Sequence, residues 1–86
     1  MGAPELRRRI VQYVRANGGW IVATTGVAHA GTPDLIACFR GRFLAIEIKA
    51  GRDTMSKRQE IERERIEKAG GTYIVAKSLT DITWYV

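Results

Sequence analysis

The chain has 86 residues, of which 45% are hydrophobic, and its formal net charge is +5. This apolar content suffices for one small folded domain and excludes intrinsic disorder. No run of about 18 apolar residues is present, which excludes a transmembrane helix. Most of the 14 basic residues are arginines, whose planar forks suit phosphate oxygens, so the charge is weak evidence for a nucleic-acid partner.

The N-terminal stretch meets arginines at once, from Arg7, and lacks the apolar segment of a secretory signal. Cys38 is the only cysteine, so an internal disulfide is excluded. Because it stands in an apolar run, we expect its side chain to be buried. These features predict a protein that works inside a cell, in the cytoplasm, without contact with a membrane.

Residues 5–17 are predicted to form an amphipathic helix. Apolar side chains recur at helical spacing, at Leu6, Ile10, Tyr13 and Val14. Pro4 fits the first helical turn, and Gly18 with Gly19 supplies the stop.

Three strands are predicted next. Residues 20–24 form the first strand, and residues 25–33 form a polar loop that contains glycine. Residues 34–39 and 43–49 are two apolar runs joined by the short turn Arg40-Gly41-Arg42. This pattern predicts an antiparallel hairpin.

A second helix is predicted over residues 56–69, after a loop at 50–54, and a fourth strand over residues 72–76. Because a helix separates the third and fourth strands, we expect them to be parallel and joined by a right-handed crossover. The tail, residues 79–86, fits a short helix or an edge strand, and the sequence does not decide. The fold class is α/β, in the order α-β-β-β-α-β, with one mixed sheet flanked by helices.

Two acidic residues and a lysine on the central strands are the candidate catalytic residues. Asp34 opens one strand, and Glu47 and Lys49 lie near the end of the next. Side chains alternate along a strand, so Glu47 and Lys49 share a face, about 6–7 Å apart along the backbone. Carboxylates are hard-oxygen metal ligands, and a cation beside them suits the cleavage of a phosphodiester.

Each of these residues also has a structural interpretation. Glu47 and Lys49 could form an ion pair at a strand end, and Asp34 could make a turn. Ser56 and Gln59 have the spacing of a capping box at the start of the second helix. One glutamine can cap a helix and touch a site with the other side of its amide, so both interpretations of Gln59 can hold together.

The sequence resembles the PD-(D/E)XK nuclease superfamily, through Pro33-Asp34 and Glu47-Ile48-Lys49. The surrounding motifs are similar to the VRR-NUC (virus-type replication and repair nuclease) family: Glu5 in the first helix, Gly31-Thr32 before Pro33, Ser56-Lys57-Arg58-Gln59, and Gly70-Gly71 before a strand. Archaeal-type Holliday junction resolvases share the catalytic pattern and are the nearest alternative. The resemblance implies a restriction-endonuclease-like core and one VRR-NUC-like nuclease domain over residues 1–86.

The resemblance also implies roles for individual residues. Asp34, Glu47 and the backbone carbonyl of Ile48 would bind Mg²⁺ or Mn²⁺. Lys49 would orient or deprotonate the attacking water or stabilise the transition state, and Gln59 would position Lys49 or a water. Glu5 would reach the metal through water or supply a second ligand position, although a carboxylate in the first turn of a helix is also favoured by the macrodipole.

The implied function is a metal-dependent endonuclease for branched or structured DNA, acting in replication, repair or recombination in a bacterial or phage-infected cell. Candidate phosphate contacts are Arg7, Arg8, His29, Arg52 and Lys57. The apolar tail has few partners within so small a chain, which predicts a two-fold homodimer. The alternatives are a catalytically silent nucleic-acid-binding module on the same fold and an unrelated basic α/β interaction domain. The intact acid–acid–lysine set favours the enzyme.

Overall fold

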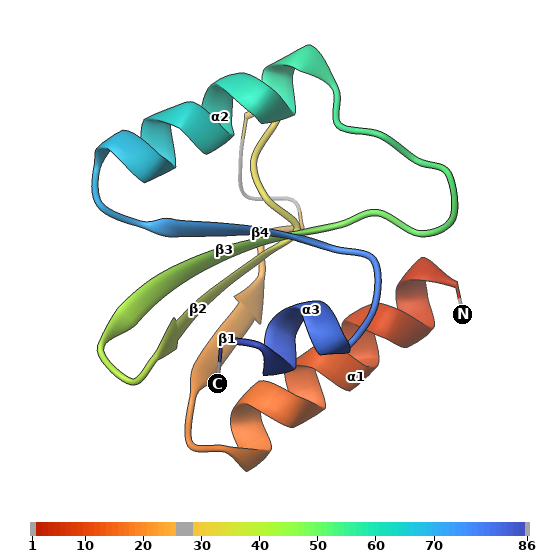
Figure 1. The fold of residues 1–86 in the computed structure, drawn as a ribbon, viewed down its shortest axis with the longest axis vertical. Helices are drawn as coiled ribbons and strands as arrows, with labels where there is room; N and C mark the ends of the chain where they lie inside the picture. The colour runs from red at the N-terminus through yellow and green to blue at the C-terminus, as the bar shows by residue number, and fades with distance from the viewer. Residues whose placement is uncertain (1, 26–28, 86) are drawn as a thin grey trace.

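The computed structural model describes residues 2–25 and 29–85. Its elements are α1 (Ala3–Ala16), β1 (Trp20–Ala23), β2 (Leu35–Phe39), β3 (Arg42–Ile48), α2 (Lys57–Lys68), β4 (Thr72–Ala76) and α3 (Thr80–Thr83). The predicted order is confirmed, and the tail forms a short helix (Figure 1). Part of the predicted loop at 25–33, namely residues 26–28, and Val86 of the tail lie outside the described residues.

The four strands form one mixed sheet in the order β1-β2-β3-β4. Neighbours β1, β2 and β3 pair antiparallel, whereas β3 and β4 pair parallel across α2, as the sequence predicts. The hairpin turns at Arg40 and Gly41, both with positive φ, of 51° and 78°. Two such residues in succession give a turn whose twist matches the flanking strands.

The helices cover both faces of the sheet, with α1 and α3 on one side and α2 on the other (Figure 1). The core lies between the sheet and the layer formed by α1 and α3, because every second residue of β2 and β3 points that way. It comprises Leu6, Ile10, Val14, Ile21, Leu35, Ala37, Phe39, Leu44, Ile46, Ile48, Ile74, Ala76 and Ile82. The opposite face of the sheet therefore remains for polar side chains and for contacts with α2.

The expected burial of Cys38 is wrong: its side chain is exposed. Ala37 and Phe39 point into the core, so Cys38 between them points to the α2 face. There it lies in one cross-strand row with Trp20 and Phe43, which are exposed too. The apolar run in the sequence therefore predicts the strand correctly, but it does not predict that side chains on one face of the strand are exposed to solvent.

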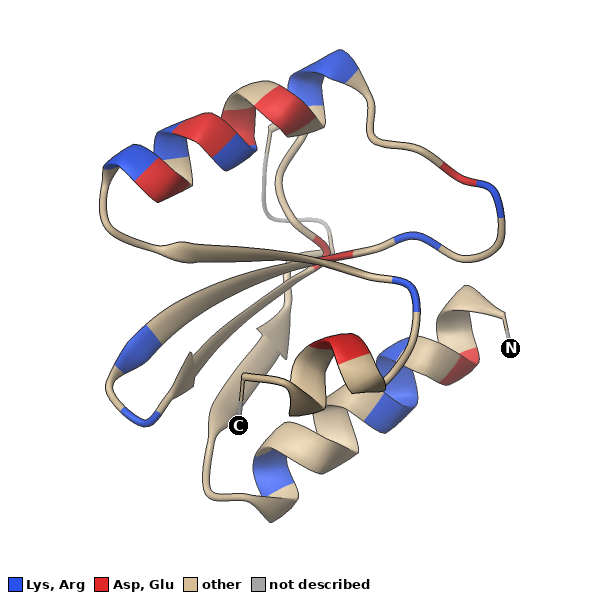
Figure 2. Ribbon diagram, in the orientation of Figure 1, with Lys and Arg blue, Asp and Glu red and all other residues tan. Residues whose placement is uncertain are grey.

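Helix α2 contains no fully buried residue, and acidic and basic side chains alternate along it (Figure 2). Ion pairs between side chains one turn apart, such as Lys68 with Glu64, stabilise this solvent-exposed helix. No helix within the described parts of the chain is long and apolar enough to span a membrane.

Candidate active site

The hairpin brings Asp34 and Glu47 to adjacent positions. Leu35 pairs with Ile46 in the β2–β3 register, so the residues next in each direction, Asp34 and Glu47, face each other across the strands. Leu35 and Ile46 point into the core. The two carboxylates therefore point to the other face, which α2 covers.

Asp34 is held from two sides. Its Oδ2 accepts a hydrogen bond from the backbone N–H of Ile48 at 2.9 Å. Its carbonyl oxygen accepts from the backbone N–H of Thr24 at 3.0 Å, and the Thr24 hydroxyl donates to the carbonyl oxygen of Pro33. No motif in the sequence indicates this contact of Thr24, whose only signal is a hydroxyl just beyond the first strand.

The loop before Asp34 is packed directly against α2. Gly31 has φ +88°, and a Cβ placed on it would lie 2.6 Å from the carbonyl oxygen of Arg58. Only glycine fits this approach. Two residues earlier, His29 Nε2 lies 2.9 Å from Glu62 Oε1, so the loop is tied to the helix by a side-chain contact as well.

Glu47 is the one charged residue among the buried side chains described, with 2% of its surface exposed. Its Oε2 accepts a hydrogen bond from Gln59 Nε2 at 3.0 Å and lies 3.7 Å from Lys49 Nζ. Its Oε1 is buried and has no hydrogen-bond partner among the described residues.

Gln59 performs both tasks that its spacing allows. Its Oε1 accepts from the backbone N–H of Ser56 at 2.8 Å, and its own N–H donates to Ser56 Oγ at 3.2 Å. This reciprocal pair is the capping box of α2. The remaining amide nitrogen reaches Glu47.

Burial, followed by the neighbouring charge of Asp34, raises the pKa of Glu47 to about 7, against the opposing charge of Lys49. A divalent cation would relieve this repulsion. The unpartnered Oε1 beside a second carboxylate is an arrangement of hard oxygens that suits Mg²⁺ or Mn²⁺. The residues present therefore fit such an ion.

Glu5 does not join this pair. Its carboxylate binds Arg8 at 2.5 Å and Arg9 at 3.1 Å on the surface of α1. Within residues 2–25 and 29–85, no three His, Cys, Asp or Glu side chains lie close enough together to hold a metal ion. The metal-linked role of Glu5 stays a prediction.

The predicted phosphate contacts lie on different elements. Arg8 is paired with Glu5 on α1, and His29 with Glu62 on α2. Arg52 and Lys57 are exposed, in the loop before α2 and at its first position. Arg7 is partly buried, and its Nε has no partner among the described residues.

Comparisons with known proteins identify the fold and the family. A family model described as archaeal Holliday junction resolvase (Hjc) matches residues 3–78. A solved structure described as a VRR_NUC domain has a TM-score of 0.82 at 23% sequence identity, over 95% of this chain and 90% of that chain. That likeness shows a shared fold. Both belong to the PD-(D/E)XK superfamily, so the resemblance seen in the sequence is confirmed. No curated protein matches the chain.

Proposed function

This chain belongs to the archaeal Holliday junction resolvase family of nucleases, and we propose that it is a metal-dependent endonuclease that hydrolyses phosphodiester bonds in branched DNA. One observation carries the proposal. Two carboxylates, Asp34 and Glu47, meet at the end of the hairpin, one oxygen of Glu47 is buried without a partner among the described residues, and Lys49 Nζ lies 3.7 Å from the other oxygen.

Asp34 and Glu47 would hold Mg²⁺ or Mn²⁺ through carboxylate oxygens, with the backbone carbonyl of Ile48 as a further ligand. When bound, the ion supplies Lewis-acid stabilisation of the phosphate and lowers the pKa of a coordinated water. Asp34 is already fixed by the N–H of Ile48, so its carboxylate needs little reorganisation.

Lys49 acts on the reacting groups and not on the metal, because an ammonium has no lone pair to donate. Its side chain is only 15% exposed and is held toward Glu47. In this setting its charge can orient the attacking water, or stabilise negative charge that develops on the phosphate. Gln59 keeps Glu47 in one orientation through its amide N–H.

The basic residues around the site contact phosphates in this proposal. Arg52 and Lys57 are exposed on the segment that enters α2 and make no ion pair with the described residues. Arg7, Arg8 and His29 are the further candidates.

Affinity for DNA should fall as the salt concentration rises. A plot of log K against log salt should have a slope of about −0.9 for each phosphate that is neutralised.

The direct test is cleavage by the purified chain of labelled four-way junctions, forks, flaps and linear duplex, with Mg²⁺, with Mn²⁺ and with a chelator. We expect metal-dependent cuts in branched substrates, and little effect of changing the base sequence at fixed structure. If the chain binds four-way DNA junctions with high affinity but cleaves none of the substrates with Mg²⁺ or with Mn²⁺, the result would instead support a catalytically silent binding module.

The metal site is tested by two substitutions of Asp34. Asp34→Asn keeps an oxygen that can accept from the N–H of Ile48, whereas Asp34→Ala removes it. Both should abolish Mn²⁺ binding in calorimetry. Only Asp34→Asn should also stabilise the metal-free protein, because it removes the repulsion against Glu47 without leaving an N–H unpaired. Unchanged Mn²⁺ affinity in both variants would refute the assignment.

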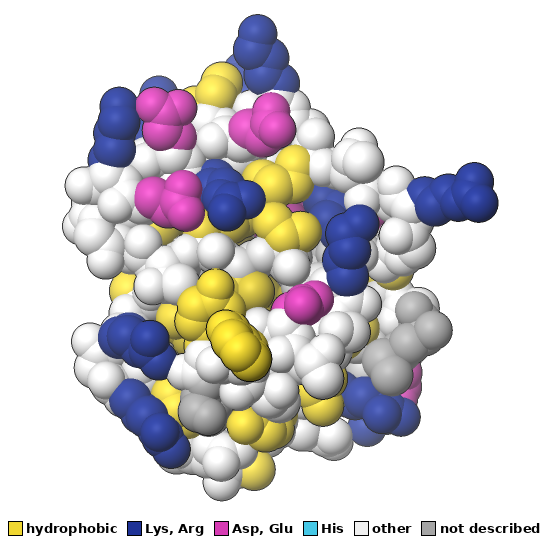
Figure 3. Space-filling view, in the orientation of Figure 1, with side chains coloured by type: hydrophobic (Ala, Val, Ile, Leu, Met, Phe, Trp, Pro, Cys, Tyr) yellow, Lys and Arg dark blue, Asp and Glu magenta, His cyan; other side chains and the backbone are white. Residues whose placement is uncertain are grey.

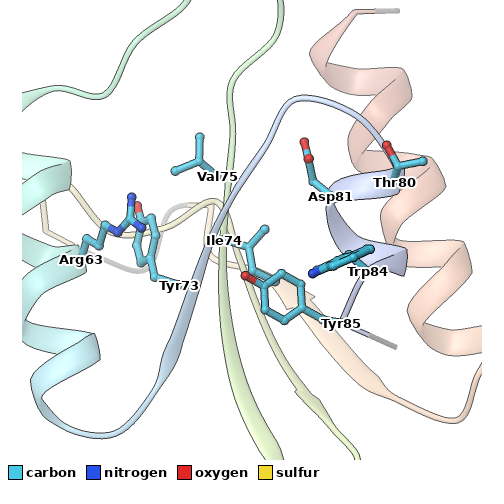
Figure 4. Close-up of a pocket in the computed structure, with 8 residues that line it drawn as sticks. All are labelled: Arg63, Tyr73, Ile74, Val75, Thr80, Asp81, Trp84 and Tyr85. Atoms are coloured by element: carbon cyan, nitrogen blue, oxygen red, sulfur yellow. The ribbon is translucent and has the colours of Figure 1, made fainter.

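We further propose a two-fold homodimer formed along β4. This strand pairs only with β3 among the described strands, so its outer edge is open. A groove of about 540 Å³ follows it, lined on one side by Arg63 and on the other by Asp81, Trp84 and Tyr85 (Figure 4). Trp84 is 84% exposed, and hydrophobic side chains gather on this face of the molecule (Figure 3). An open edge without proline suits pairing with the same strand of a second copy.

Light scattering tests the dimer. Wild-type protein should be dimeric at high micromolar concentration. Trp84→Ser should dissociate it, and Trp20→Ser, which changes an exposed tryptophan on β1, should not. A monomeric wild type, or a dimer sensitive only to Trp20→Ser, would contradict this interface.

A further inference from the structure

Tyr73 is a buried polar residue for which the proposed reaction has no role. It lies on β4, and 4% of its surface is exposed. Its hydroxyl is buried without a hydrogen-bond partner among the described residues. The guanidinium of Arg63 on α2 lies 5.4 Å from the ring centroid, and Figure 4 shows the two side chains side by side. The ring therefore packs against Arg63, while the hydroxyl oxygen, its one polar atom, has no hydrogen-bond partner among the described residues.

Tyr73 and Glu47 occupy the same region of the sheet. Tyr73 pairs with Ala45 in the β3–β4 register, and Glu47 lies two residues further along β3 on the same face. A step of two residues along one strand and one strand across separates the Cα atoms by about 8 Å, within reach of long side chains. Burial, followed by the negative charge of Glu47, raises the pKa of Tyr73 to about 12. The phenol thus remains a hydrogen-bond donor at neutral pH.

A buried donor, the Tyr73 hydroxyl, and a buried acceptor, Glu47 Oε1, therefore belong to diagonal neighbours on one face of the sheet, and neither atom has a partner among the described residues. Polar atoms buried in native proteins are normally paired directly or through water. A water between them would satisfy both, and a carboxylate oxygen has a second lone pair left for a cation.

We propose that Tyr73 is a positioning residue, whose hydroxyl donates a hydrogen bond through one bound water to Oε1 of Glu47. With Gln59 on Oε2, this contact would fix both oxygens of the carboxylate. The consequence of this contact for metal binding rests on the proposed function, in which Glu47 is a metal ligand. Groups that orient a ligating carboxylate typically affect metal affinity or activity about 10–100-fold. The contact itself exists with or without metal.

The first experiment tests the contact in metal-free protein. Urea unfolding is measured for wild type, Tyr73→Phe, Glu47→Ala and the double variant. Tyr73→Phe removes only the hydroxyl, so any non-additivity reports on that hydroxyl. We expect clear non-additivity for this pair and additivity for a control cycle of Tyr13→Phe with Glu47→Ala. Additive effects for Tyr73, together with a more stable Tyr73→Phe, would show an isolated hydroxyl and overturn the proposal.

The second experiment measures Mn²⁺ affinity by calorimetry and junction cleavage under single-turnover conditions. Tyr73→Phe should bind Mn²⁺ about 10–100-fold more weakly, whereas Tyr13→Phe should match wild type. If wild type binds no Mn²⁺, the proposed function fails, while the unfolding cycle still decides the role of Tyr73. Wild-type Mn²⁺ affinity in Tyr73→Phe would contradict the positioning role.

Discussion

The side-chain amide of Gln59 connects the first turn of α2 to the buried carboxylate of Glu47 on β3. Its nitrogen donates to Glu47 Oε2 at 3.0 Å, while its oxygen accepts from the backbone N–H of Ser56 at 2.8 Å. The orientation of a site carboxylate and the start of a helix thus depend on one side chain. The two tasks can be separated by mutation, because the Ser56 side chain takes part only in the cap among the contacts of the described residues.

Ser56→Ala should lower the free energy of unfolding by about 1 kcal/mol, the usual cost of losing an N-cap, and leave cleavage near wild type. Gln59→Ala should destabilise the protein by a similar amount and also slow cleavage by about 10–100-fold, because Glu47 loses its donor. Urea unfolding and single-turnover cleavage measure the two effects. Equal cleavage rates in the two variants would mean that the Gln59–Glu47 contact has no catalytic consequence.

The stability of the metal-free protein should fall as the pH rises from about 4.5 to about 7. Burial raises the pKa of Glu47 from 4.5 to about 7, so the folded state binds its proton more tightly than the unfolded state. The stabilisation of the folded state by protonated Glu47 is therefore fully present below pH 4.5 and is lost as the pH rises through 7. Above that pH the stability no longer depends on this group. The size of this stabilisation is on the order of 2 kcal/mol.

Glu47→Gln isolates this contribution. The difference in unfolding free energy between the variant and wild type, measured in chelator, should grow in favour of the variant between these pH values and then level off. Parallel curves would contradict a raised pKa. Mn²⁺ affinity of wild type should weaken below about pH 7, because protons and metal compete for the carboxylate.

Lys49→Ala should separate chemistry from binding. Cleavage should fall by about 10²-fold or more, the scale for losing a positioned acid–base or electrostatic group. Since Lys49 lowers the pKa of Glu47, metal affinity is compared at about pH 8.5, where Glu47 is ionised in both proteins and affinity should agree within a few-fold. A simple ion pair predicts a stability loss of at most about 1 kcal/mol with turnover intact. Lys49→Arg should also cleave poorly, because the planar guanidinium has a different shape from the compact ammonium that it replaces.

Gly31→Ala should disturb the site from outside it. The new Cβ would meet the backbone of Arg58 at 2.6 Å and would also require a left-handed φ of +88°. Gly18→Ala is the matched control, because Gly18 has φ +84° but no atom within 4 Å of its Cβ position. The control should lose only the strain energy of a left-handed alanine, on the order of 1 kcal/mol.

Gly31→Ala should lose more stability than this control and should slow cleavage, since the loop that carries Asp34 is displaced from α2. Melting temperature and single-turnover rates measure both effects. Equal losses of stability in the two variants would show that the loop can move away from α2 without cost.

Much of the fold could be predicted from the sequence, because its elements follow from local patterns. The hairpin between β2 and β3 follows from two apolar runs around Arg40-Gly41, and the helical spacing of Leu6, Ile10 and Val14 identifies α1. The parallel pairing of β4 follows from the helix between it and β3. The tail carried no such pattern, and its short helix appeared only in the structure.

The sequence by itself also determined that Glu47 and Lys49 share one face, because side-chain alternation is a property of any strand. Only the tertiary structure decided which face stays open and which atoms meet. Exposure of Cys38, the contact of Gln59 with Glu47 and the burial of the Tyr73 hydroxyl all depend on where α2 lies over the sheet. That placement is set by packing between residues far apart in the chain, such as Gly31 against Arg58, and no local pattern encodes it.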